Sequence, residues 1–342
     1  MRKIWIAGLI ILNSWISFAG KNDSCSTNKL DPDYIKTCYN DLVVRVFSAN
    51  KNNFIQFHDQ NEGVRLKYRP NDYYNLGIGF NYKWFGLKIG TKIPMLSGDD
   101  HRYGKTTSFG LQSYIYSRKF TLDILAIKTR GYYLSELEEE GLEIPGLEQY
   151  YTRRDLITNN FGINFNYVVN NRRFSYKAAF KQTDIQLKSA GSLIYGGGVY
   201  LITVEADSAF VPSEIGNQYF TNGRQQNNFE AYTLNTNLGY AYSLVPSKNW
   251  IITGSYRFSL GLQQNVWHFT GEDTDHQFKL SWSSAFQLSA GHYFPNFYLG
   301  ASLVRYQQNS KIQYRDISIL NGTNFMEFTM SKRIQLKRRK SR

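Results

Sequence analysis

One short polar stretch carries residue types that could activate a water molecule. Asp99, Asp100 and His101 are consecutive in "SGDDHRYG", and an aspartate beside a histidine can act as a general base. Placed above a membrane barrel, such a pair would suit protease-like hydrolysis. The same stretch is also good turn chemistry, because glycine and aspartate favour tight turns. We expect a turn here and keep hydrolysis as the alternative.

A second pair, His276 and Ser284, would suit a lipase-like reaction. Both fall on the even-numbered positions that carry the apolar residues of the alternating stretch at 277–291. Eight residues along one extended strand span about 26 Å, at about 3.3 Å per residue, so the two side chains cannot touch. A histidine from another strand would have to complete the site.

No pattern for a metal or a cofactor emerges from the remaining residues. The "GGGVY" stretch at 196–200 lacks the Lys-Ser/Thr of a phosphate loop and lies in an alternating stretch. The histidines are too scattered for metal-ligand spacing. We expect no catalytic residue, no cofactor and no metal. The histidines are His58, His101, His268, His276 and His292.

The elements that must position these residues are long stretches with a period of two. In "TLNTNLGYAYSL" at 233–244, large apolar residues alternate with small polar ones, and the pattern recurs along the chain. A soluble strand has about 5–6 residues, whereas a strand that crosses a bilayer needs about 9–11. The long stretches therefore predict membrane-crossing strands. Expected to face lipid are Leu238, Tyr240, Phe258 and Leu280, and expected to face the lumen are Asn237, Arg257 and Lys279.

Short turns alternate with long polar connections, as in transmembrane barrels, whose turns are short on one side only. The apolar parity flips across the short turns, as tight hairpins require. We predict an all-β, transmembrane antiparallel up-and-down β-barrel of 12–14 strands; a large soluble β-sandwich is the alternative. Twelve strands are predicted near 63–69, 75–84, 86–94, 107–116, 119–128, 158–169, 173–182, 229–244, 250–264, 277–291, 296–307 and 324–336, and 42–47 and 193–206 would make fourteen.

The two ends of the chain differ from the alternating body. Residues 1–19 have a basic start, an apolar run and the small-residue site Ser17-Phe18-Ala19, which predicts a cleaved export signal. We assign 20–40 to a periplasmic N-terminal segment, 41–336 to the barrel and 337–342 to a basic tail. Cys25 and Cys38 are the only cysteines, and an oxidising compartment would allow them to pair. The sequence leaves open whether they do.

The formal charge of +13 is concentrated at the two ends. Arg2 and Lys3 lie in the export signal, and seven basic residues lie within the last eleven. With an export signal, nucleic acid is excluded as a partner. We expect outer-membrane lipids, lipopolysaccharide phosphates and the outer-membrane assembly machinery as partners. No protein partner can be named from the sequence.

A basic set falls on the inward parity, and no run of acids offsets it. An open barrel lined in this way would prefer anions, because low-dielectric walls focus the field of the wall charges. The alternative is a plugged barrel, filled by inward Tyr and Arg or by residues 20–40, with the lysines paired to acids. The basic set comprises Lys83, Lys88, Lys92, Lys177, Lys181, Arg257 and Lys279.

Several motifs resemble a known family. The stretches "YRPN", "YKWFGL", "YGKT" and "KSAGS" are the most specific parts of a similarity that covers most of the chain. The chain resembles the domain of unknown function 4421 family, outer-membrane barrels of Bacteroidetes-type Gram-negative bacteria. The resemblance implies an outer-membrane location and a barrel, without an activity or site residues. One departure is the end, because this chain continues past Ile334 and Leu336 into "KRRKSR" instead of finishing on an aromatic.

We expect a passive role, either as a channel for small solutes or as a structural and scaffolding barrel. The alternatives are an outer-membrane enzyme of lipase or protease type and a gated transporter. Strand number does not decide among them, because about 8 strands give a filled interior and about 16–18 give an open channel.

Overall fold

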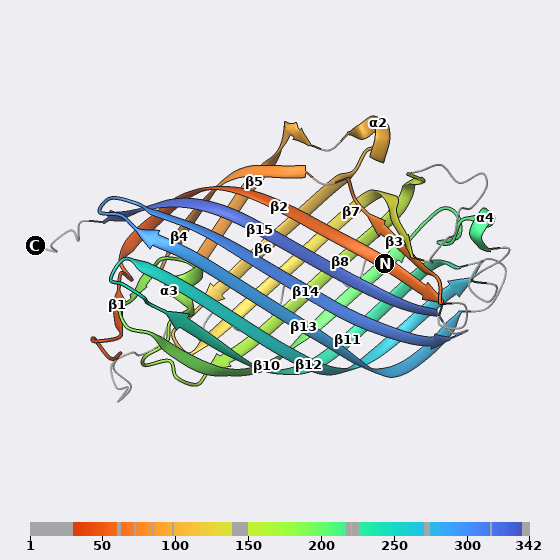
Figure 1. The fold of residues 1–342 in the computed structure, drawn as a ribbon. Helices are drawn as coiled ribbons and strands as arrows, with labels where there is room; N and C mark the ends of the chain where they lie inside the picture. The colour runs from red at the N-terminus through yellow and green to blue at the C-terminus, as the bar shows by residue number, and fades with distance from the viewer. Residues whose placement is uncertain are drawn as a thin grey trace, which may run out of the picture.

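A computed structural model describes residues 30–59, 63–71, 73–83, 85–97, 99–138, 150–216, 220, 226–269, 274–314 and 317–336. Its strands pair antiparallel and close into one barrel, shown in Figure 1 with the axis running from left to right. The predicted fold class, an all-β transmembrane antiparallel up-and-down barrel, is confirmed.

Within the described residues, thirteen strands form the barrel sheet. They are β2 (Asp41–Asp59), β3 (Arg65–Arg69), β4 (Tyr73–Tyr82), β5 (Phe85–Ser97), β6 (Thr107–Tyr116), β7 (Phe120–Glu138), β8 (Thr152–Val168), β10 (Ala190–Glu205), β11 (Gln226–Leu244), β12 (Trp250–Phe269), β13 (Asp275–Tyr293), β14 (Tyr298–Tyr314) and β15 (Ile317–Gln335). The other elements are β1 (Ile35–Thr37), α2 (Asp100–Tyr103), α3 (Tyr176–Phe180), β9 (Asp184–Gln186) and α4 (Ser213–Gly216). Within the described ranges, no helix is long and apolar enough to span a membrane.

The barrel closes through β2 and β15, the first and last of its strands. They pair along their whole length, from Ile317 opposite Asp59 to Gln335 opposite Asp41. The stretch at 42–47 therefore belongs to the closing strand, and the stretch at 193–206 lies in β10. The end of β15 at Gln335 settles where the last strand stops.

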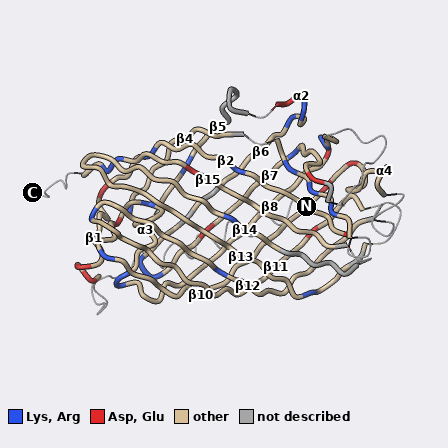
Figure 2. The backbone as a smooth tube through the Cα atoms, in the orientation of Figure 1, with Lys and Arg blue, Asp and Glu red and all other residues tan. Residues whose placement is uncertain are grey.

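The two ends of the barrel have different connections. We call the end with the short connections after β4, β6, β11 and β13 the turn end, and the opposite end the loop end. In Figure 1, α3 and β1 lie at the turn end and α2 and α4 at the loop end. Figure 2 shows most charged residues gathered at these two ends.

The wall contains more strands at the turn end than at the loop end. Strand β2 pairs with β4 through Leu42–Asn50, and further along with the short β3 through Ile55–His58. Strand β3 pairs on its other side with β7. Around the turn end the ring has twelve strands, namely β2, β4, β5, β6, β7, β8 and β10 to β15, and around the loop end ten, namely β2, β3, β7, β8 and β10 to β15.

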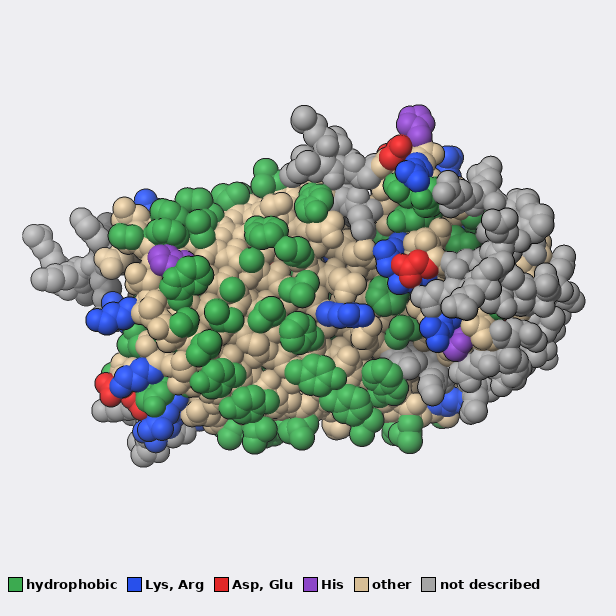
Figure 3. All heavy atoms as spheres, viewed as in Figure 1, with side chains coloured by type: hydrophobic (Ala, Val, Ile, Leu, Met, Phe, Trp, Pro, Cys, Tyr) green, Lys and Arg blue, Asp and Glu red, His purple; other side chains and the backbone are tan. Residues whose placement is uncertain are grey.

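The outer face of the barrel is apolar. Leu234, Leu262 and Leu280 lie opposite one another on β11, β12 and β13, and are 63%, 63% and 78% exposed. Figure 3 shows such side chains spread over the middle of the barrel. Alternate residues point inward, and Asn237 and Arg257 are buried. Leu238, Tyr240, Phe258 and Leu280 are exposed on the outer face, as their predicted orientation requires.

One predicted strand is wrong. Residues 173–182 contain the helix α3 instead, and they lie inside the barrel. The Ser175 side chain caps this helix by accepting a hydrogen bond from the backbone N–H of Ala178. Gln182, just after the helix, has a positive φ of 57° that breaks any extended run. The alternating apolar residues that suggested a strand here pack against the inner wall.

Leu238 tests the assignment of the outer face. It lies midway between Tyr232 and Leu244, the outermost exposed large apolar residues of β11. Leu238→Arg should lower the free energy of unfolding by about 2–4 kcal/mol, the cost of arginine on the lipid face near the midplane. Leu244→Arg, at the turn end, is the matched control and should cost about 0–1 kcal/mol. Urea titration of the two variants in lipid bilayers measures both, and equal costs would contradict the orientation.

Candidate functional site

A folded segment blocks the lumen at the turn end. Residues 169–189 contain α3 and β9, and β9 pairs with β1 from the N-terminal segment. We call 169–189 together with β1 the turn-end plug. Its buried apolar residues pack against the inner wall in two clusters, which include Tyr116, Ile194, Ala241, Ile251 and Tyr298 of the wall.

Hydrogen bonds tie the turn-end plug to strands around the ring. Arg45 of β2 donates to the Gln182 side chain at 2.8 Å, and Arg333 of β15 donates to the Gln182 carbonyl at 2.8 Å. Asn81 of β4 donates to the Lys181 carbonyl at 3.0 Å. The Tyr176 hydroxyl meets Ser255 of β12 at 2.8 Å. The plug is therefore held from several sides of the barrel.

The inward charges are largely paired. Glu327 of β15 is 2% exposed and accepts hydrogen bonds from the Lys88 ammonium at 2.6 and 2.9 Å, with the Arg45 guanidinium 3.8 Å away. Inside the plug, Lys177 lies 3.5 Å from Asp184. The two partners of Glu327 are distant from it in the sequence, whereas Lys177 and Asp184 are close.

A third inward pair lies deeper in the barrel. The Arg257 guanidinium is 3.9 Å from a carboxylate oxygen of Asp123 and donates to Asn164 at 3.2 Å. The Tyr116 hydroxyl donates to the other oxygen of Asp123 at 2.8 Å. Asp123, Asp184 and Glu327 are the acids that parity reasoning missed. Asp123 and Glu327 are single acids within alternating stretches, Asp184 lies outside them, and only the fold shows which cation each acid meets.

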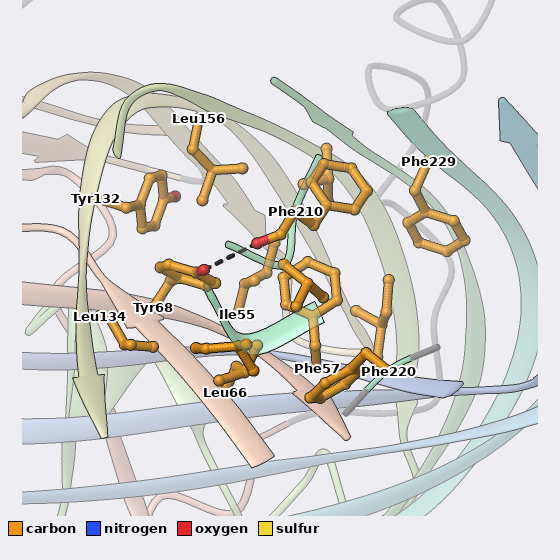
Figure 4. Packing of buried hydrophobic residues seen from close by; sticks show 14 of the residues in the cluster. Ile55, Phe57, Leu66, Tyr68, Tyr132, Leu134, Leu156, Phe210, Phe220 and Phe229 are labelled. Carbon is orange, nitrogen blue, oxygen red and sulfur yellow. Dashed lines mark hydrogen bonds between the residues drawn. The ribbon is translucent and has the colours of Figure 1, made fainter. Parts of the chain in front are cut away.

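A second closure lies at the loop end. We define the loop-end plug as residues 206–216 together with Phe220, a segment that includes α4. Phe210, Val211, Ile215 and Phe220 pack into a buried cluster with inward residues of β2, β3, β7, β8, β10, β11, β12 and β15. Figure 4 shows this packing, with the Tyr68 hydroxyl donating to the Phe210 carbonyl at 2.8 Å.

Arg153 of the wall strand β8 forms hydrogen bonds with the loop-end plug. Its guanidinium donates to the Ala209 carbonyl at 2.7 Å and to both carboxylate oxygens of Asp155 at 2.9 Å. Asp155 in turn accepts from the backbone N–H of Asp207 at 3.2 Å. The bidentate pair within β8 has a fixed geometry and orients both side chains, and their bonds to Ala209 and Asp207 hold the plug against β8.

Two small cavities lie between the plugs within the described part of the chain. One of about 100 Å³ is lined by Asp123, Asn164, Tyr200, Arg257 and other polar residues. The second, of about 70 Å³, lies against the turn-end plug. Such volumes hold a few water molecules, well below the roughly 300–1,000 Å³ of a typical ligand site.

The predicted basic set is dispersed by the fold. Lys88, Arg257 and Lys279 lie on wall strands, whereas Lys177 and Lys181 belong to the turn-end plug. Lys83 lies in the hairpin after β4, with its ammonium 5.1 Å from the Tyr82 ring centroid. The side chain of Lys92 lies outside the described part of the structure.

Lys181 lies deep in the turn-end plug, just after α3, and not on a wall strand. It is fully buried, and its ammonium lies 4.7 Å from the centroid of the Tyr116 ring. Burial lowers the pKa of this plug residue to about 6, which favours the neutral amine at neutral pH.

The aspartates first considered for hydrolysis form hydrogen bonds that stabilise the local fold. Asp99 caps α2 by accepting from the backbone N–H groups of His101 and Arg102 at 2.8 and 3.3 Å. Asp100 accepts from Asn71 at 2.9 Å. The predicted turn at this position is therefore a capped helical turn. His276 and Ser284 lie on the single strand β13.

The cysteine prediction rests partly on residues that the structure does not describe. Cys25 lies outside the described residues, so its pairing with Cys38 stays a prediction. Cys38 is half-buried between β1 and β2, and burial raises the pKa of its thiol. The export signal at 1–19 and the basic tail at 337–342 also lie outside the described residues.

No group of three or more His, Cys, Asp or Glu suited to a metal ion occurs within the ranges that the structure describes. Outside the plugs and the paired charges described above, the lumen presents mainly Asn, Gln, Ser and Thr side chains.

Solved structures similar to this chain are membrane barrels at low identity. The outer membrane protease OmpT from Escherichia coli is 9% identical with a TM-score of 0.37, covering 91% of this chain and 99% of that one. The Pseudomonas putida toluene transporter TodX is 8% identical with a TM-score of 0.29, covering 85% and 89%. Outer-membrane expressed OmpT of Vibrio cholerae is 7% identical with a TM-score of 0.28, covering 85% and 97%.

A search of curated proteins finds no match to this sequence. The sequence pattern of one protein family matches residues 22–331, which is nearly the whole described barrel and its plugs. The family is the one that the sequence motifs suggested, and the chain belongs to the domain of unknown function 4421 family.

Proposed function

We propose that this protein is an outer-membrane barrel whose lumen is closed along its axis, and that its role is structural or scaffolding. The observation that carries the proposal is the presence of two independent closures, one at each end of the barrel. An open solute channel, the other passive role considered from the sequence, needs a continuous aqueous path. Among the described residues, the cavities found between the two plugs are small.

The location rests on the shape and surface of the barrel. Strands of up to 20 residues carry an apolar outer face, and the longest connections between strands, from β7 to β8 and from β10 to β11, lie at the loop end. Barrels of the outer membrane place short turns in the periplasm and long loops outside. We therefore assign the turn end to the periplasm and propose outer-membrane lipids as the partners of the apolar face. Lipopolysaccharide and the assembly machinery stay predictions.

A gated transporter is the second candidate. The turn-end plug is joined to the wall by side-chain hydrogen bonds and apolar packing, and its one strand pairing is between β9 and β1 within the plug. Such contacts can break without disturbing a wall strand. No enzymatic role is proposed, because the Asp99 carboxylate is engaged as a helix cap.

Conductance in planar lipid bilayers tests the closed lumen. The protein, recovered from the outer-membrane fraction, should insert without producing steady ion-conducting steps. Three variants extend the test: residues 171–187 replaced by a short Gly-Ser linker, residues 207–224 replaced in the same way, and both replacements together. Because each plug seals the lumen by itself, only the double variant should conduct.

Heat-modifiable gel mobility shows whether each variant still forms a barrel. Steady conductance of the unmodified protein would overturn the closed-lumen proposal. Conductance of the unmodified protein only in short bursts would favour the gated transporter. Recovery as a soluble periplasmic protein without detergent would contradict the proposed location.

A further inference from the structure

The wall of the barrel is incompletely paired at one place. Neighbouring strands β5 and β6 pair only at Phe85–Ile115 and Gly86–Tyr114, next to the turn end. On their other sides both strands are well paired, β5 with β4 and β6 with β7. Beyond Gly86, the facing edges of β5 and β6 have no strand partner among the described residues. We call the gap between residues 87–91 and 107–113 the seam.

The topology explains why the seam exists. Toward the loop end, β3 pairs directly with β2 and β7, so the ring is already closed there without β5 and β6. The extra hairpin of β5 and β6 therefore has room only near the turn end. In Figure 1, β5 stands out above the wall, with α2 beyond it.

Hydrogen bonds anchor the residues just before β6 to the connection between β3 and β4 and to β7. Asn71 lies in the connection between β3 and β4. Its backbone N–H donates to the Thr106 hydroxyl at 2.9 Å, and its side chain donates to the Gly104 carbonyl at 3.0 Å. Thr106 in turn donates to the Gly131 carbonyl of β7 at 2.7 Å. The seam is therefore paired next to the turn end, and β6 is anchored to its neighbours at the other end.

The seam lies within the apolar outer face. Val46, Ile78 and Ile89 lie opposite one another on β2, β4 and β5 and are 50%, 50% and 62% exposed. On β6, every residue from Thr107 to Leu111 is exposed, on both faces of the strand, and Phe109 is 75% exposed. Unpaired backbone groups in contact with hydrocarbon are costly, so a polar group has to reach these edges.

A lysine stands behind the seam on the inner side. Lys51 of β2 approaches β6, and its ammonium lies 3.1 Å from where a Cβ on Gly110 would be. Near it, the hydroxyls of Ser108 and Thr129 meet at 3.2 Å. Within the described residues, no carboxylate forms an ion pair with Lys51. Unlike Lys88 and Arg257, this inward cation has no acid partner there.

We propose that the seam binds a membrane lipid with an anionic phosphate head group, which enters sideways from the bilayer. The phosphate accepts hydrogen bonds from the Lys51 ammonium and from unpaired backbone N–H groups of β5 and β6. The acyl chains stay outside, along Ile89 and Phe109. The argument rests on the unpaired edges, their apolar surroundings and the unpaired cation. It is independent of whether the lumen conducts along its axis.

Lipid retention tests the head-group site. The protein is released from nanodiscs of phosphatidylglycerol or of phosphatidylcholine and weighed by native mass spectrometry. We expect one retained phosphatidylglycerol and no retained phosphatidylcholine. Lys51→Gln should weaken retention by about tenfold or more, the effect of losing one charge-assisted contact. Lys51→Arg should restore it, and Lys279→Gln, an inward lysine on β13, should leave it unchanged.

Two results would overturn the lipid proposal. One is equal retention of both lipids, and the other is equal retention by Lys51→Gln and the unmodified protein. A copurified protein bound in place of lipid would likewise overturn it, because a partner strand would then occupy the edges.

Cysteine cross-linking tests the seam itself, in a background with Cys25→Ser and Cys38→Ser. Phe85→Cys with Ile115→Cys joins two residues that are paired in the structure and is the control. Ile89→Cys with Leu111→Cys joins the residues that would face each other if the same register continued. The control should oxidise rapidly, and the seam pair at least about tenfold more slowly, because disulfides need Cα atoms within about 7 Å. Equal rates would show that β5 and β6 are paired at these residues as well and that no seam exists.

Discussion

Replacing Glu327 with alanine should lower the free energy of unfolding by about 3–5 kcal/mol, the cost of breaking a buried ion pair from one side. Glu327 is buried and serves both the Lys88 ammonium and the Arg45 guanidinium. Without it, two inward cations lie close together with no acid between them. Arg45 also holds Gln182 of the turn-end plug, so the plug should loosen as well. Urea titration in lipid bilayers measures the loss.

Two further variants separate charge from packing at Glu327. Glu205→Ala, at an exposed glutamate near the end of β10, is the matched control and should change stability by less than about 0.5 kcal/mol. Adding Lys88→Met to Glu327→Ala should recover part of the loss, because one uncompensated cation is removed. A Glu327→Ala protein as stable as the unmodified one would contradict the paired-charge description of the lumen.

Replacing Trp267 with alanine should cost about 3–5 kcal/mol, the range for truncating a large buried aromatic residue. Trp267 of β12 is fully buried in the loop-end cluster, and its ring centroid is 4.4 Å from that of Phe229. The cavity would lie directly beneath the loop-end plug. We therefore expect the 206–216 segment to become a site of protease cleavage in the folded barrel.

Trp250 provides a control of the same residue type on the same strand. It faces outward at the turn end and is 48% exposed. Trp250→Ala should cost clearly less than Trp267→Ala and should leave the loop-end plug resistant to protease. If both variants lost the same stability, the inward cluster at the loop end would not be the packed core described above.

The wall of the barrel was predictable from the sequence because lipid imposes a strict period of two on long strands. The same rule failed at 173–182, where Phe174, Tyr176 and Phe180 alternate as a lipid-facing strand would. These residues find an apolar surface inside the barrel, and alternation cannot distinguish an inner wall from a bilayer. Ser175 was the one local sign of a helix, since serine is a preferred N-cap.

The inner charges were only partly predictable. Parity placed Lys88 and Arg257 inside, but their acid partners lie on strands far away in the sequence, and Glu327 is 239 residues from Lys88. Matching them requires the register across the whole ring. The seam was unpredictable for a related reason. It arises because β3 joins β2 to β7 toward the loop end, whereas β5 and β6 look like an ordinary hairpin in the sequence.

The closed lumen is tested most directly by the reactivity of a cysteine placed between the plugs. Ser259 of β12 is 9% exposed and lines the inner cavity, whereas Ser247 lies exposed in the turn between β11 and β12. In the background without native cysteines, Ser247→Cys should react quickly with a charged, membrane-impermeant maleimide. Ser259→Cys should react only after unfolding. Labelling of Ser259→Cys in the folded barrel at a rate comparable to Ser247→Cys would contradict a lumen closed at both ends.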